Sequence, residues 1–168
     1  MKIRITAFFL ICLILISQLI GCSDSKSFSH CELTLVLDKD FSREESEEFD
    51  LLLSNGELVL GVNRISFAAG LNQGISDTYT DKGFAAFFMH ESGKSENLLM
   101  HGSIPYYTYT ENGEGSDYFY TVTFYRSKHA YFTVAYVTES DKKELWSERI
   151  LKFAEAAYFN DAEDITVS

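Results

Sequence analysis

The chain has 168 residues, of which 25 are acidic and 14 are basic, so its formal net charge is −11. Nucleic acid is excluded as a natural partner, because a phosphate backbone is bound by basic rather than acidic surfaces. Three cysteines are too few for a disulfide-rich scaffold, so stability has to come from core packing.

The first 21 residues have the layout of a secretory signal peptide. Lys2 and Arg4 precede an apolar run over residues 5–20, which is short for a membrane-spanning helix. The run ends at Leu19-Ile20-Gly21-Cys22, which resembles the lipobox of bacterial lipoproteins. The resemblance implies cleavage before Cys22 and a diacylglyceryl group on its sulfur. An uncleaved membrane helix and a plain secretory signal are the alternatives.

Cleavage before Cys22 leaves 147 residues with 12 basic and 25 acidic side chains, a formal charge of −13. This length suits one domain with its own core. Anionic lipid headgroups repel such a charge, so the acyl chains of Cys22 would be the membrane contact. We expect the chain on the extracytoplasmic face of the plasma membrane, or in an outer membrane if the host has one.

Four segments follow from this interpretation: a signal peptide at 1–21, a serine-rich lipidated tether at 22–31, a single domain at 32–160 and an acidic tail at 161–168. Cys12 leaves with the signal and lipid consumes the thiol of Cys22. Cys31 then remains as a lone thiol. A tolerated cysteine is favoured there over a redox or metal-binding one.

The first part of the domain reads as strand, turn and hairpin. Leu33, Leu35 and Leu37 alternate with other residues, which predicts a strand. Ser42 and Glu45 resemble a capping box, so a turn or a short helix from Arg43 is expected. Two apolar stretches flank Asn55-Gly56, which favours a hairpin; a helix over 43–53 is the alternative.

Two amphipathic helices and three strands make up the rest. Thr80 is a plausible N-cap for a helix with Phe84, Phe87 and Phe88 at helical spacing. Residues 98–138 contain three stretches rich in Tyr, Phe, Val and Thr, separated by short links, which predicts antiparallel strands. A final helix, capped by Asp141, carries an apolar stripe of Trp146, Ile150, Phe153 and Ala157.

These strands carry apolar side chains on both faces. Tyr118, Tyr120, Val122 and Phe124 fall on one face of residues 118–125, with Phe119 and Tyr125 on the other. Such a pattern favours a sheet that is covered on both sides. The expected fold class is α+β, an antiparallel β-sheet flanked by helices.

Residues 106–159 carry a tyrosine-rich strand, a glycine-containing turn, an aromatic hairpin and a closing helix. This order resembles the PsbP-like family of α/β/α sandwiches. The resemblance implies a small extracytoplasmic domain, generally without a catalytic centre, that acts as a binding or assembly accessory. No binding residue is carried over from the family, because no ligand motif matches position by position.

Tyrosine is the most concentrated candidate for binding. Adjacent tyrosines such as Tyr106 and Tyr107 point to opposite faces of a strand, so one row can lie near the surface, where aromatic rings anchor partners. Packing inside the sheet is favoured for most of these tyrosines, because sheets select such residues for packing alone. The candidate partner-binding residues are Tyr106, Tyr107, Tyr109, Tyr118 and Tyr120.

The other chemistry-bearing residues do not assemble into a motif. The four histidines, at 30, 90, 101 and 129, lack the spacing of a zinc site. The acidic segment 38–48 suits weak Ca²⁺ binding, yet it lacks the glycine and the terminal glutamate of an EF-hand. A solvated acidic face is favoured. We predict no catalytic residues, no metal and no cofactor.

The sequence thus favours a membrane-anchored, non-catalytic binding or assembly module whose partner is an envelope protein, a peptide or a small ligand. One alternative is an envelope hydrolase whose carboxylates are brought together only by the fold. Another is a spacer or surface lipoprotein without a ligand.

Overall fold

The computed structural model describes residues 25–94, 96–113 and 115–160. The expected signal peptide, the lipidation site Cys22 and the acidic tail lie outside these residues. Within them, no helix is both long enough and apolar enough to cross a bilayer.

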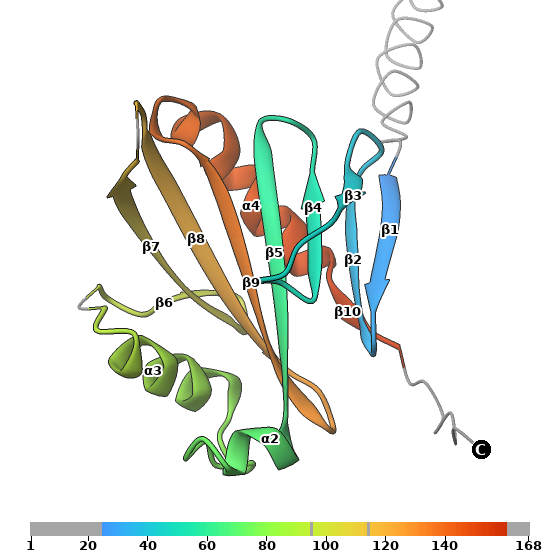
Figure 1. Ribbon diagram of the computed structural model, residues 1–168, viewed down its shortest axis with the longest axis vertical. Coiled ribbons are helices and arrows are strands. Elements are labelled where there is room, and N and C mark those ends of the chain that lie inside the picture. The colour runs from blue at the N-terminus through green and yellow to red at the C-terminus, as the bar shows by residue number, and fades with distance from the viewer. Residues whose placement is uncertain (1–24, 95, 114, 161–168) are drawn as a thin grey trace, which may run out of the picture.

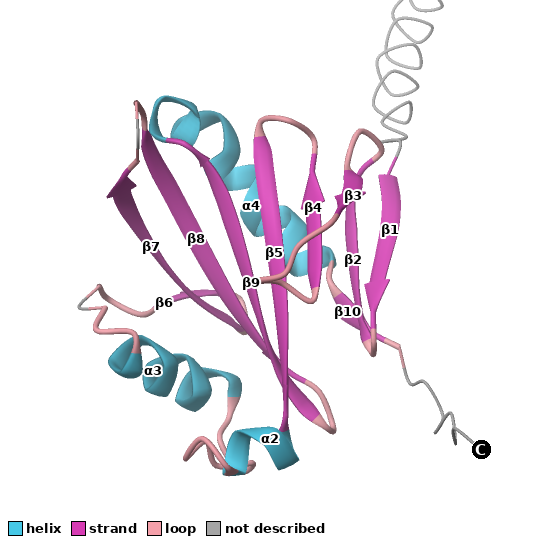
Figure 2. Ribbon diagram, viewed as in Figure 1, coloured by secondary structure: helices cyan, strands magenta, loops and turns pink. Residues whose placement is uncertain are grey.

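The domain contains two antiparallel sheets (Figures 1 and 2). The larger sheet has the strand order β3-β4-β5-β9-β8-β7-β6, and the smaller has the order β1-β2-β10. The strands are β1 (Ser25–His30), β2 (Leu33–Asp38), β3 (Ser42–Glu44), β4 (Leu51–Ser54), β5 (Leu58–Ser66), β6 (Leu99–His101), β7 (Ile104–Asn112), β8 (Asp117–Arg126), β9 (Ala130–Glu139) and β10 (Tyr158–Phe159).

Both faces of the larger sheet are covered, each over its own core. One core lies between this sheet, helix α4 (Lys143–Ala156) and the small sheet. The other lies beneath helix α3 (Asp81–Glu91), which crosses only the lower part of the opposite face in Figure 1. The predicted α+β class, an antiparallel sheet flanked by helices, is confirmed.

Helix α3 forms as the sequence predicts. The Thr80 hydroxyl accepts a hydrogen bond from the Gly83 N–H at 3.1 Å and caps the first turn. Phe84 is fully buried, and its ring stacks on that of Tyr131 with 4.3 Å between centroids. The Tyr131 hydroxyl donates to the carbonyls of Ser76 and Tyr79, which fixes the loop before the helix. A one-turn helix, α2 (Phe67–Leu71), precedes this loop and was not expected.

Helix α4 also forms, with Trp146, Ile150 and Phe153 buried along one side. The expected cap is wrong. Asp141 lies inside a 3₁₀ turn, η1 (Ser140–Lys142), and the N-cap position of α4 falls on Lys142 without a side-chain cap.

The expected tether is a strand over residues 25–30. β1 pairs with β2 along its whole length, and Phe28 is buried in the core with 7% of its surface exposed. The Ser29 and Thr34 hydroxyls are hydrogen-bonded across the pair at 2.8 Å. The outward-facing side chains of this strand are serines, and Phe28 is the one side chain of residues 25–30 that is buried in the core. The sequence of this segment therefore does not look like that of a strand.

A helix beginning at Arg43, short or extending over 43–53, is not formed. Ser42–Glu44 instead pairs with β4, because Leu51 and Leu53 gain burial on the large sheet that a helix there would not provide. The hairpin around Asn55-Gly56 is confirmed. Gly56 adopts a φ of 87°, and the Asn55 side chain accepts from the Leu58 N–H at 2.8 Å.

Two further differences concern strand ends. Where the sequence predicted one strand at the start of residues 98–138, the structure has two, β6 and β7. Gly102, at a φ of 57°, reverses the chain between them. After α4 the chain returns to the small sheet, where β10 pairs with β2.

Candidate partner-binding site

The strand register places four of the five candidate tyrosines on one side of the large sheet. Tyr109 on β7 lies opposite Tyr120 on β8, and Glu111 lies opposite Tyr118. Tyr107 is two residues before Tyr109 and shares its side. We call Tyr107, Tyr109, Tyr118 and Tyr120 the tyrosine face. Tyr106 points to the other side of the sheet and does not join it.

Three of these rings form a ladder. The rings of Tyr109 and Tyr120 are 4.6 Å apart and nearly parallel, with an angle of 4° between their planes. Tyr107 stacks on Tyr109 at 5.6 Å, and on its other side it lies 6.0 Å from Phe124 in the core beneath α3. The exposed rings are therefore continuous with the core and have little freedom to rearrange.

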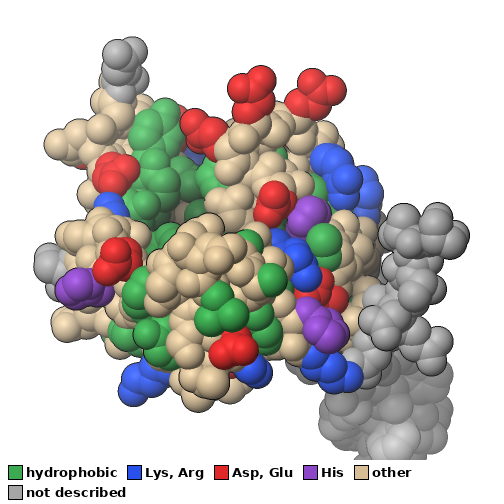
Figure 3. All heavy atoms as spheres, turned by 60° about the horizontal axis from the view of Figure 1, so that its bottom comes forward, with side chains coloured by type: hydrophobic (Ala, Val, Ile, Leu, Met, Phe, Trp, Pro, Cys, Tyr) green, Lys and Arg blue, Asp and Glu red, His purple; other side chains and the backbone are tan. Residues whose placement is uncertain are grey.

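The tyrosine face changes from buried to open along the strands. Tyr107 has 2% of its surface exposed, whereas Tyr109, Tyr118 and Tyr120 are half-buried. The row of side chains on this face continues past Tyr120 onto the neighbouring strand, β9. Figure 3 shows apolar side chains gathered beside a hollow below the β7–β8 turn. This end of the sheet is not covered by α3 (Figure 1).

Charged side chains that the sequence analysis missed stand around Tyr109. The Lys94 ammonium lies 3.6 Å from the centroid of the Tyr109 ring and 2.7 Å from Glu111 Oε1. Glu96 Oε2 is buried and has no hydrogen-bond partner among the described residues. Glu111 could have been found from its alternation with Tyr109, but Lys94 and Glu96 arrive through the path of the loop after α3.

The environment raises the pKa of three of these tyrosines, Tyr107, Tyr109 and Tyr120, and so keeps them neutral. Burial, aided by the charges of Glu96 and Glu111, raises the pKa of Tyr107 to about 12. Burial also raises the pKa of Tyr109 and of Tyr120, with Glu111 adding to the effect in both. Protonated phenols donate hydrogen bonds and offer ring faces, but they are poor nucleophiles and bases.

Acidic residues border the tyrosine face where β8 and β9 meet the loops. Glu139 pairs with Tyr118 across the sheet. Beside this pair is a hollow of about 300 Å³ lined by Ser116, Asp117, Glu139, Ser140 and Asp141. Among the described residues, no group of three or more His, Cys, Asp or Glu side chains is placed to hold a metal ion.

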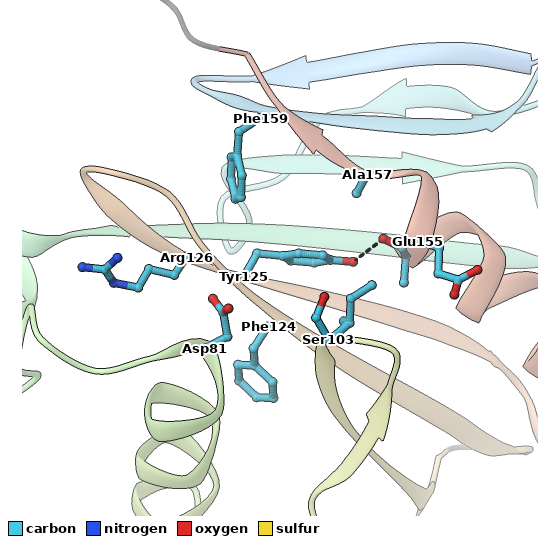
Figure 4. Close-up of a pocket in the computed structure, with 10 residues that line it drawn as sticks. Asp81, Ser103, Phe124, Tyr125, Arg126, Glu155, Ala157 and Phe159 are labelled. Atoms are coloured by element: carbon cyan, nitrogen blue, oxygen red, sulfur yellow. Dashed lines mark hydrogen bonds between the residues drawn. The ribbon is translucent and has the colours of Figure 1, made fainter.

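A second hollow, of about 230 Å³, lies between the start of α3, the β6–β7 turn and the end of α4 (Figure 4). Asp81, Ser103, Arg126 and Glu155 provide its polar groups. Burial raises the pKa of Asp81 despite the nearby charge of Arg126. The volume of this hollow is below that of ordinary small-molecule sites.

Two of the polar side chains of this second hollow are engaged with the protein itself, whereas the buried Oδ1 of Asp81 has no hydrogen-bond partner among the described residues. Glu155 Oε1 lies 3.0 Å from His101 Nε2, and Arg126 donates to the carbonyl of Asp77. The Tyr125 hydroxyl donates to the Ala154 carbonyl, as the dashed line in Figure 4 marks. These contacts tie α4 and the loop before α3 to the sheet.

The remaining candidates are dispersed. In the acidic segment, Asp38 pairs with Arg149 on α4, and Asp40 accepts from Asn55. Cys31 is exposed in the β1–β2 turn at a φ of 50°. His90 is exposed and pairs with its neighbour Glu91.

No protein-family model matches the sequence, and no curated protein is similar to it. Among solved structures, a crystal structure from Bacteroides thetaiotaomicron is similar with a TM-score of 0.56 and 12% identity, over 84% of this chain and 50% of that one. The chain thus spans about half the length of that protein. The solution structure of cyanobacterial PsbP (CyanoP) from Synechocystis is similar with a TM-score of 0.48 and 10% identity, over 84% of this chain and 95% of that one.

These similarities concern the fold. At 12% identity, the Bacteroides structure shows that the same arrangement of sheet and helices occurs in another protein.

Proposed function

We propose that the chain is a lipid-anchored, extracytoplasmic binding module that captures an envelope protein or peptide on its tyrosine face. The observation that carries the proposal is the row of half-buried rings left uncovered beyond α3, the helix that packs over the neighbouring part of the same face. Tyrosine supplies large contact area at a small cost in side-chain entropy, and it is enriched among the residues that dominate binding energy.

Stacking supports this role. Because Tyr109 is held between Tyr107 and Tyr120, its ring is already fixed in the free protein. A pre-ordered contact surface loses less conformational entropy on binding than a mobile one. The neutral hydroxyls can donate hydrogen bonds to a partner without carrying a charge of their own.

The proposed anchor would hold this face close to the bilayer. Ser23 and Asp24 alone separate Cys22 from the start of β1, and an extended chain spans about 3.5 Å per residue, so the strand would begin within about 10 Å of the lipidated cysteine. β1 starts at the same end of the molecule as the β7–β8 turn (Figure 1). A partner at or near the membrane surface fits this placement.

Site-specific photo-crosslinking in intact cells tests the binding face. A benzophenone amino acid at Tyr120 should form a discrete adduct with one or a few envelope components. The matched control places the same group at Leu145 on α4, which has 57% of its surface exposed on the opposite side of the sheet. Identical adducts from both positions would contradict the proposed face.

Labelling with radioactive palmitate tests the anchor separately. The wild-type protein should incorporate label and sediment with membranes, and Cys22→Ser should do neither. Cys31→Ser is the control, since that thiol is exposed but lies in a turn of the folded domain. Equal labelling of the Cys22→Ser variant would remove the anchor from the account.

A further inference from the structure

We propose that the partner segment is basic, and that one of its Lys or Arg side chains takes the position over Tyr109 that Lys94 holds in the free protein. This inference rests on the proposed function and adds to it the chemistry of the partner. It also gives Lys94 a role, that of an internal competitor for the site.

The contacts of Lys94 define a cation site. Its ammonium is 3.6 Å from the centroid of the Tyr109 ring and 2.7 Å from a Glu111 oxygen. An aromatic face backed by a carboxylate attracts ammonium and guanidinium groups through the ring quadrupole and direct charge. The chain therefore already carries, on the tyrosine face, a bound example of the group that we expect from a partner.

The site has more negative charge than Lys94 balances. Glu96 also lies close enough for its charge to raise the pKa of Tyr107 and Tyr109, and its buried Oε2 lacks a hydrogen-bond partner among the described residues. A buried carboxylate oxygen without a partner is costly. A second cationic or donor group from a bound peptide would relieve that cost.

The border of the tyrosine face also carries an excess of negative charge. Lys142 is shared between Glu57 at 3.3 Å and Glu139 at 3.7 Å, so it neutralises only part of the charge there. Among the described residues, the acidic side chains near this end of the sheet include Glu57, Glu96, Glu111, Asp117, Glu139 and Asp141. Charge complementarity thus favours a basic segment. A second copy of the chain, equally acidic, would be repelled.

Lys94 can leave without refolding the loop. Its backbone N–H donates to the Met89 carbonyl at 3.0 Å, which fixes the main chain at the end of α3. The side chain has 23% of its surface exposed, so a change of rotamer carries the ammonium into water. Such changes in partly exposed side chains are fast compared with peptide binding.

A pair of opposite substitutions tests the inference with fluorescent hexalysine as the probe, measured on the mature lipoprotein in phosphatidylcholine nanodiscs at low salt. Lys94→Met removes the competitor but keeps the length of the side chain, and should tighten hexalysine binding about tenfold. Glu111→Gln removes the carboxylate, and should weaken binding about tenfold. Both effects should shrink as NaCl is raised.

Matched controls separate this site from the general acidity of the protein. Lys152 and Glu148 form an exposed pair on α4 at 2.7 Å, so Lys152→Met and Glu148→Gln change the net charge by the same amounts. Their hexalysine affinities should stay within twofold of wild type. Equal shifts from Lys94→Met and Lys152→Met would overturn the inference. If Lys94→Met does not fold, unchanged binding by Glu111→Gln would overturn it instead.

The inference and the proposed function fail in different ways. A discrete adduct from Tyr120 whose cross-linked peptide contains no Lys or Arg would leave the binding face in place and overturn the basic partner. Hexalysine binding that responds to Lys94→Met and Glu111→Gln supports the cation site whether or not a cellular adduct is found.

Discussion

The rings of Tyr109 and Tyr120, on two neighbouring strands, lie 4.6 Å apart and almost parallel. The next ring of the row, Tyr107, is buried in the core beneath α3. This pair joins the core to the surface. Whatever stabilises the packing of α3 also sets the position of the rings that a partner would meet.

The first prediction concerns that packing. Phe84→Ala should reduce the free energy of unfolding by about 3–5 kcal/mol, because a fully buried ring stacked on Tyr131 is replaced by a cavity. Urea unfolding followed by near-UV circular dichroism measures the change. Leu145→Ala, on an exposed residue of α4, should change it by less than about 0.5 kcal/mol.

The second prediction concerns β1. Phe28→Ala should destabilise the domain by about 3 kcal/mol, since Phe28 is buried in the core that α4 and the two sheets share. Ser27→Ala, on the exposed side, should be nearly neutral. Hydrogen exchange gives an independent readout. Protection of residues 25–30 should match that of β2, and rapid exchange there would restore the tether interpretation.

The third prediction concerns low pH. Burial tends to raise the pKa of Glu32, but hydrogen bonds from Arg64 and Ser127 outweigh it and hold the pKa below the usual value. A carboxyl with a lowered pKa in the folded state stabilises the fold above its unfolded pKa, and this contribution is lost as the pH falls through the folded pKa.

Glu32→Gln should therefore cost about 1–3 kcal/mol at pH 7 and much less at an acidic pH below the folded pKa of Glu32, where the wild-type side chain is protonated as well. Chemical unfolding at the two pH values measures this difference. Glu148→Gln, on a fully exposed residue, serves as the control. A loss for Glu32→Gln that is the same at both pH values would show that the ionised carboxylate is not the stabilising group.

The fourth prediction concerns high pH. Burial raises the pKa of Tyr107 and of Tyr125 to about 12. Between pH 10 and 12 the unfolded chain loses these protons while the folded chain keeps them, so stability should fall as the pH rises through this range. Tyr107→Phe should reduce the steepness of that fall. Absorbance titration of the folded protein should show two classes of tyrosine.

Much of the fold could be predicted from periodicity, turn residues and caps. Asn55-Gly56 marked the hairpin, Thr80 marked the start of α3, and the double-sided apolar strands indicated cover on both faces. The predictions that failed concern segments whose secondary structure depends on pairing with a strand elsewhere in the chain. Ser25–His30 reads as polar until β2 is beside it, and Ser42 satisfies the local rule for a helix cap while β4 offers it a strand partner.

The candidate site was predicted in part for the same reason. Alternation along β7 separates Tyr106 from Tyr107, but only the register between β7 and β8 brings Tyr109 onto Tyr120. Lys94 reaches the ring of Tyr109 from a loop 15 residues earlier in the chain, and no local pattern signals that contact.

The most direct test is an NMR titration of the lipoprotein, carrying ¹³C-labelled tyrosine rings, with hexalysine. The ring signals of Tyr109, Tyr118 and Tyr120 should shift on binding. Tyr106, on the other side of the same strand, should be unaffected, as should the exposed Tyr158. Shifts at Tyr106 or Tyr158 with none at Tyr109 and Tyr120 would contradict binding at the tyrosine face.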